Sequence, residues 1–198
     1  VVVMHGAFTN DSAEGLSLPG HTCVILNGKI RNTYEPKESD LFELISMKGK
    51  GCNSFSGGQV VSDQKVFAAI SAADSSNVLL IEDVSIDLHS EHGGVGSNSV
   101  NAVSSKKHYG PFVIRGCDVR DPGHRGIWAH VSKRVYALGN VCSAGGFSID
   151  FDAYCFHSAA IFNTVTKNTY HSGIFFEECV KSNTAFANLC KKNSANGI

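Results

Sequence analysis

The stretch Gly126–Ile174 reads GIWAHVSKRVYALGNVCSAGGFSIDFDAYCFHSAAIFNTVTKNTYHSGI, and it repeats a short pattern. A glycine followed by an apolar residue occurs at Gly126, Gly146, Gly173 and Gly197, with spacings of 20, 27 and 24 residues. A unit of about two dozen residues has the length of one coil of a solenoid. The repeat therefore decides the architecture.

Asparagine forms a second series with the same period. Asn140, Asn163 and Asn188 are 23 and 25 residues apart. Asparagine tolerates the left-handed backbone conformation of a tight corner, and its side-chain amides can stack from coil to coil. The series therefore predicts one corner of the solenoid.

Short extended segments fill the repeats. They are too short and too rich in β-branched and aromatic residues for helices, and Gly, Asn and Ser separate them. Examples are Val78–Ile81, Val84–Ile86, Phe112–Ile114 and Phe147–Phe151. A leucine-rich repeat has a similar period, but leucine is sparse and helical periodicity is missing. The pattern favours a parallel β-solenoid with three corners in each coil.

The repeat extends over most of the chain. Steps of 24 and 33 residues lead from Ile127 to Val103 and Ile70, and the longer step predicts a loop insertion over residues 88–101. We predict a single domain over residues 1–198 with about seven coils. Residues 1–40 form an N-terminal coil or cap region in this prediction, and the C-terminal coil is truncated.

Composition narrows the function classes. The chain has 198 residues, 42% hydrophobic and 18% charged, with a net charge of −1, which fits a single globular domain with a sizeable core. No apolar run approaches the roughly 18 residues of a membrane span. The balanced charge gives no indication of nucleic acid as a partner. Seven cysteines without a CxxC pair argue against structural zinc and predict mainly buried thiols.

This pattern of glycine-apolar pairs, recurrent asparagines and stacked Val and Ile resembles the right-handed parallel β-helix of the pectate-lyase-like superfamily. The resemblance covers the chain from about Leu16 onward and concerns the fold. It implies an extracellular protein whose partner is a polysaccharide. The superfamily includes lyases, uronate epimerases, glycoside hydrolases, tailspikes and non-catalytic surface proteins, so fold alone does not choose among them.

Alignment of the glycines predicts which side chains point outward. If the glycines are in register, Ile127, Phe147 and Ile174 point inward, and the alternate positions face out in rows about 4.8 Å apart. One predicted outer row is Trp128, Ser148 and Phe175. The other is Lys106, His130, Asp150 and Glu177.

The second row has the chemistry of an active site. Neighbouring carboxylates raise each other's proton affinity, and a nearby His or Lys can act as a base. Trp128 and Phe175 offer flat faces for a sugar ring. We expect a lyase or epimerase that abstracts a proton from a uronate. Paired carboxylates, Asp150 and Glu177, would instead make a glycoside hydrolase. A solvated face with cross-strand pairs worth about 0.2–1 kcal/mol is the non-catalytic alternative.

Two further groups complete the candidates. The run Asp121-Pro122-Gly123-His124-Arg125 resembles the Asp-Pro-His motif of mannuronan C5-epimerases, with an extra glycine. The resemblance makes Asp121 and His124 catalytic candidates, with Tyr109 as their tyrosine partner, whereas a plain proline-glycine turn is the alternative. Tyr109 and Arg125 are also our candidates for binding substrate.

A calcium site is the second group. Asp150, Asp152 and Glu177 could supply three of the oxygen ligands that calcium prefers. The Asp-x-Asp pair is similar to the calcium-binding acids of pectate lyases.

Overall fold

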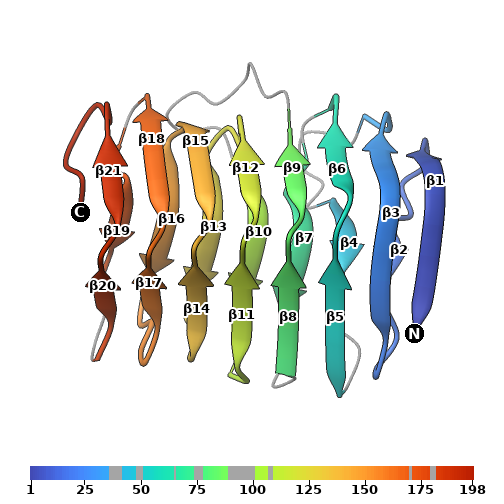
Figure 1. Ribbon diagram of the computed structural model, residues 1–198, viewed down its shortest axis with the longest axis horizontal. Helices are drawn as coiled ribbons and strands as arrows, with labels where there is room; N and C mark the ends of the chain where they lie inside the picture. The colour runs from blue at the N-terminus through green and yellow to red at the C-terminus, as the bar shows by residue number, and fades with distance from the viewer. Residues whose placement is uncertain are drawn as a thin grey trace.

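The computed structural model describes residues 1–35, 42–47, 51–64, 66–73, 78–88, 101–106, 109–169, 171–178 and 182–198. In this part of the chain every regular element is a β-strand, and the strands stack in parallel as a β-solenoid of about six turns (Figure 1). The predicted all-β parallel solenoid is confirmed, with about six turns where the sequence predicts about seven. Most of the predicted insertion over residues 88–101 lies outside the described residues.

A regular coil contributes one strand to each of three faces, so the predicted three corners are present. The first face is a seven-stranded sheet of β2 (Leu16–Ser17), β4 (Glu43–Ser46), β7 (Ala68–Ala73), β10 (Asn101–Lys106), β13 (Arg125–His130), β16 (Phe147–Asp152) and β19 (Ile174–Phe176). The second face contains β5 (Cys52–Ser56), β8 (Val78–Glu82), β11 (Phe112–Arg115), β14 (Val135–Leu138), β17 (Ala159–Ile161) and β20 (Thr184–Phe186). The third contains β6 (Gln59–Ser62), β9 (Ser85–Asp87), β12 (Asp118–Arg120), β15 (Val141–Gly145), β18 (Thr164–Asn168) and β21 (Leu189–Lys191).

One long strand joins the second and third faces. β3 (Cys23–Asn32) pairs with β5 over its first part and with β6 over its last part, which makes the two faces one fourteen-stranded sheet. β1 (Val2–Asn10) pairs with β3 along its whole length. These strands lie at the N-terminal end of the stack (Figure 1).

Columns of apolar side chains fill the interior. The column under the seven-stranded sheet consists of Ile45, Ile70, Ile127, Ile149 and Ile174, each at most 1% exposed. β-branched residues favour extended strands and pack well in such columns. Full burial of each isoleucine stabilises the fold by about 1.5–3 kcal/mol. Stacking of equivalent apolar side chains thus stabilises the coils.

The register between β13 and β16 differs from the prediction by two residues. Ile127 pairs with Ile149, not with Phe147. Phe147 pairs with Arg125, and its ring stacks on that of Phe175 with centroids 5.2 Å apart. Ser148 was predicted to face outward, but it is buried and donates a hydrogen bond to Asn168 Oδ1 at 2.8 Å. From Ile149 onward the alternation of side chains is the predicted one, so the shift moves Asp150 and Asp152 along the outer rows, whereas Ser148 before it is buried.

The predicted asparagine stack exists. Asn140 donates through its backbone N–H and its Nδ2 to Asn163 Oδ1, and Asn163 donates in the same way to Asn188 Oδ1, at 2.9 and 3.0 Å in both steps. The left-handed conformation belongs to the preceding residue, with φ of 56° at Phe162 and 51° at Ala187. The predicted role of asparagine in backbone conformation is therefore wrong, whereas its role in amide stacking is confirmed.

The cysteines that the structure describes are all free: Cys23, Cys52, Cys117, Cys142, Cys155 and Cys190. Only Cys117, Cys142 and Cys155 are buried, so the prediction of mainly buried thiols holds for half of them. Burial raises the pKa of Cys117 to about 11, and it raises the pKa of Cys142 further. Thiols in this state are poor nucleophiles and poor metal ligands. They act as small apolar side chains in the core.

Candidate functional site

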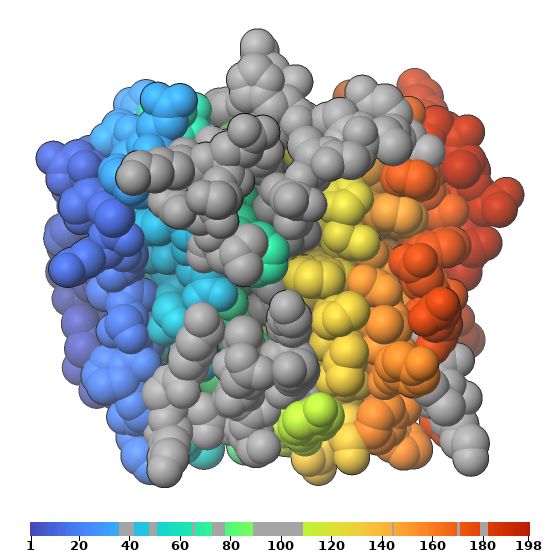
Figure 2. All heavy atoms as spheres, turned by 180° about the vertical axis from the view of Figure 1, so that it is seen from behind, coloured from blue at the N-terminus to red at the C-terminus, as the bar shows by residue number. Residues whose placement is uncertain are grey.

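The candidate site lies on the outer face of the seven-stranded sheet, where β13, β16 and β19 follow one another. This face is turned toward the viewer in Figure 2, with β13 and β16 in yellow and orange. The observed register creates two outer rows, because Trp128 pairs with Asp150 and His130 with Asp152. The first row is Trp128, Asp150 and Phe175, and the second is His130, Asp152 and Glu177. Glu177 belongs to the second row because its backbone N–H donates a hydrogen bond to Phe151 O, which places it beside Asp152.

The rows differ from the predicted ones in the residues of β16. Asp152 takes the position beside His130 that was predicted for Asp150, and Asp150 takes the one predicted for Ser148. Lys106 pairs with His130 through the backbone, as predicted. The physical reason for the error is the alignment on glycine. Gly126 lies inside β13, whereas Gly146 precedes β16 in the corner beneath His124.

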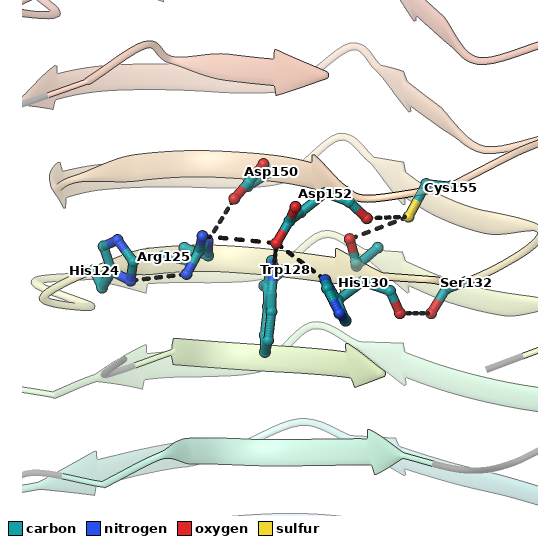
Figure 3. Close-up of polar contacts among 9 residues, drawn as sticks. His124, Arg125, Trp128, His130, Ser132, Asp150, Asp152 and Cys155 are labelled. Carbon is teal, nitrogen blue, oxygen red and sulfur yellow. Dashed lines mark hydrogen bonds and ion pairs between the residues drawn. The ribbon is translucent and has the colours of Figure 1, made fainter. Parts of the chain in front are cut away.

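Asp152 is the centre of a hydrogen-bonded group (Figure 3). Its Oδ2 accepts a hydrogen bond from Trp128 Nε1 at 3.2 Å and lies 3.1 Å from His130 Nδ1. Because a carboxylate only accepts, this contact places the proton of neutral His130 on Nδ1. The lone pair of Nε2 is then free, and the His130 side chain is 27% exposed. Asp152 thus orients a histidine that can accept a proton from a bound molecule.

Asp150 is buried under Arg125. Its side chain is 0% exposed, and Arg125 Nε donates a hydrogen bond to its Oδ2. Its Oδ1 is also buried and has no hydrogen-bond partner among the described residues. Burial raises the pKa of Asp150 to about 7, against the lowering effect of Arg125. In this position Asp150 cannot touch a substrate. Its burial therefore argues against the predicted catalytic role, which stays a prediction.

His124 and Phe147 extend the site toward the next corner. Arg125 Nη1 lies 2.8 Å from His124 Nδ1, and a guanidinium only donates, so His124 accepts. Burial and the charge of Arg125 lower the pKa of His124 to about 4. The ring of Phe147 stacks on His171 at 4.2 Å with an interplanar angle of 4°. His124 is therefore a neutral imidazole beside an aromatic stack.

The titration of Asp150 gives a prediction for stability. The folded protein holds the Asp150 proton more tightly than the unfolded chain, where the pKa is near 3.8. The stabilisation is complete below pH 4 and is lost as the pH rises through about 7. An Asp150→Asn variant does not titrate, so the free energy of unfolding of wild type minus that of the variant should fall between pH 4.5 and 8, by on the order of 2–4 kcal/mol.

Urea unfolding of both proteins at pH 4.5, 6 and 8 measures this difference. The low pKa of His124 has the opposite effect on stability, because its contribution is lost as the pH falls toward 4. His124 is present in both proteins, so it cancels in the comparison. A difference that does not change with pH would show that Asp150 titrates normally.

The predicted calcium ligands are brought together, but they do not fit a calcium ion well. Asp150, Asp152 and Glu177 each have an oxygen within 4.8 Å of the others. Calcium takes 6–8 oxygen ligands. Here Oδ2 of Asp150 already accepts from Arg125, and Oδ2 of Asp152 accepts from Trp128. The guanidinium of Arg125 thus already uses a carboxylate oxygen that a metal ion would need as a ligand.

The remaining predicted residues lie apart from this group. Asp121 is exposed at the corner before β13, with a φ of 43°, and its N–H donates to Ser143 O. Tyr109 lies at the corner before β11, where Lys133 Nζ is 5.5 Å from its ring centroid and Arg134 donates to its carbonyl. Their predicted roles stay predictions.

The sequence reasoning missed the two aromatic partners of the site. Phe147 was expected inside, and His171 was not considered. Both could have been found by counting back from the inner isoleucines. His171 precedes Ile174 by three residues, as His124 precedes Ile127, and Phe147 precedes Ile149 by two. Phe67, with its ring centroid 6.1 Å from that of Trp128, comes from a coil two steps earlier.

Comparison with protein-family models, with curated proteins and with solved structures finds no match to this chain. Among the described residues there is no helix long and apolar enough to cross a membrane. The function therefore has to be argued from the geometry of the site.

Proposed function

We propose that this protein is a carbohydrate-active β-helix of the pectate-lyase-like kind, a lyase or epimerase that removes a proton from a uronate in an extracellular polysaccharide. The His130–Asp152 contact carries the proposal. Asp152 holds the proton on Nδ1, so Nε2 is the free base, and the pair lies on an outer sheet face beside Trp128. This is the arrangement by which a carboxylate orients a catalytic histidine.

The reaction begins at C5 of the uronate. His130 Nε2 takes the C5 proton, and the electron pair moves into the sugar carboxylate. In a lyase the C4–O bond then breaks and a C4=C5 double bond forms, with the leaving oxygen taking a proton from an acid. Glu177, half-buried in the same row, is our candidate for that acid. In an epimerase the C4–O bond stays intact, His130 keeps the abstracted proton, and an acid or water molecule on the other face of the ring gives a different proton to C5.

Hydrolysis by paired carboxylates is the second candidate. A carboxylate oxygen of Asp152 and one of Glu177 lie within 4.8 Å of each other. In retaining glycosidases the two carboxyl groups are about 5–5.5 Å apart, which is a similar separation. The buried Asp150 is not the partner in this version. The position of His130 between solvent and Asp152 has no role in hydrolysis, which is why we prefer proton abstraction.

Product analysis on alginate, pectin and glycosaminoglycans tests the proposal. A lyase gives unsaturated products with ultraviolet absorbance, and an epimerase exchanges the C5 hydrogen for deuterium from the solvent. Reducing ends without either signal would support the hydrolase. If the folded protein binds these polymers without changing them, or ignores them all, the proposed activity is wrong and the fold serves binding or structure.

A further inference from the structure

We propose that Arg125 is the built-in cation of the cluster formed by Asp150, Asp152 and Glu177, so that this cluster excludes a divalent metal ion. Removal of the guanidinium should convert the cluster into a metal site. The inference concerns the same surface as the proposed function, but it does not depend on any reaction. It rests on the contacts of Arg125 and on the carboxylate oxygens that these contacts leave open.

All three nitrogens of the guanidinium have partners. Nε donates to Asp150 Oδ2, Nη1 donates to His124 Nδ1 at 2.8 Å, and Nη2 lies 3.8 Å from Asp152 Oδ2 (Figure 3). The side chain of Arg125 is only 13% exposed. A largely buried guanidinium that is held by a hydrogen bond through Nε, a second through Nη1 and a longer ion pair through Nη2 has a defined position, in contrast to a surface arginine that moves freely.

Aromatic rings hold the guanidinium in the same place. Its central carbon lies 4.9 Å from the ring centroid of Trp128 and 5.7 Å from that of Phe147. Arginine stacks well on aromatic faces because its charge is spread over a plane and is weakly hydrated. A hydrated metal ion lacks this property, so the aromatic surroundings favour arginine.

The charges of the cluster explain why one cation is favourable there and why a second one is not. Three carboxylates have oxygens within 4.8 Å of one another, and Asp150 is 0% exposed. With Arg125 present, a second cation among these oxygens would be repelled at short range in a site of low dielectric constant. Without the guanidinium, Asp150 Oδ2 becomes available beside its unpartnered Oδ1. Both oxygens of Asp150 are then open, and no other arginine or lysine among the described side chains is paired with the three carboxylates.

Terbium luminescence can test this directly. Tb³⁺ binds calcium-type oxygen sites, and it emits when an excited tryptophan lies close by. Trp128 is the only tryptophan of the chain, and its Nε1 is 3.2 Å from Asp152 Oδ2. Excitation of this residue therefore reports on metal bound at the cluster. Addition of Ca²⁺ in excess should displace the signal.

We expect no saturable emission from wild type and saturable emission from Arg125→Gln. The Tb³⁺ concentration that half-saturates Arg125→Gln should be at least about tenfold below the highest concentration at which wild type still shows no saturation. Arg125→Lys keeps the charge and should behave as wild type. Asp150→Asn added to Arg125→Gln should remove the gain. Arg115→Gln is the matched control, because it frees a single carboxylate, Glu82, on another face.

Circular dichroism and thermal melting show which variants are folded. Saturable, calcium-displaced emission from wild type would overturn the proposal, and so would a folded Arg125→Gln protein that gains nothing. If Arg125→Gln does not fold, the wild-type titration decides alone: saturable binding contradicts the proposal and its lack supports it. None of these readouts uses a glycan, so a failure of the proposed enzyme activity is recognised separately.

Discussion

Replacement of His130 by glutamine should lower the turnover of a uronate-containing glycan by about 10²–10⁴-fold and leave the fold intact. The loss is the usual contribution of a positioned general base. Glutamine is similar in size and can still donate a hydrogen bond to Asp152, but its side chain has no basic nitrogen. His130 is partly exposed, with 27% of its side chain accessible, so its replacement removes little buried area.

The measurement is the initial rate of product formation on the polymer that wild type converts. His157→Gln is the matched control, because His157 is exposed at a corner of the following coil and should be replaceable without loss of activity. Asp152→Asn should also reduce turnover, since an amide no longer fixes the proton on Nδ1 of His130. A folded His130→Gln protein with wild-type turnover would remove His130 from the mechanism.

The features that repeat along the chain could be predicted from the sequence. The step of 24 residues correctly placed the backbone of Lys106 beside that of His130, and the asparagine spacing correctly predicted the stack of Asn140 and Asn163. Both follow from counting, because stacked strands repeat the same contacts in every coil. The fold and the stacking of the coils can therefore be predicted from the repeat length of the sequence.

The details of the site could not be counted in this way. The coils vary in length at their corners, so the two glycines that were aligned, Gly126 and Gly146, occupy different positions, and the register of β16 was wrong by two residues. Nothing in the spacing shows that Arg125 folds over Asp150 and buries it. That arrangement depends on side-chain packing between the coils of β13 and β16, and packing becomes visible only in coordinates.

The second large effect is expected in the asparagine stack. Asn163→Ala should destabilise the protein by about 3 kcal/mol or more, because the side chain is 1% exposed and serves two neighbouring coils. Its Oδ1 accepts two hydrogen bonds from Asn140, and its Nδ2 donates to Ala137 O at 2.9 Å. Alanine leaves these buried groups without that partner, and each such loss costs about 1–3 kcal/mol.

Thermal melting and urea unfolding measure the effect, and the Tm should fall by roughly 6–12 °C for a chain of this size. Asn188→Ala is the informative comparison. Asn188 also accepts from Asn163 and donates to Ala160 O, but it is only half-buried. Water can replace its hydrogen bonds, so we expect a loss of about 1 kcal/mol. Equal losses for the two variants would mean that burial does not strengthen the hydrogen bonds of the stack, and a loss near zero for Asn163→Ala would mean that the apolar columns alone hold the coils in register.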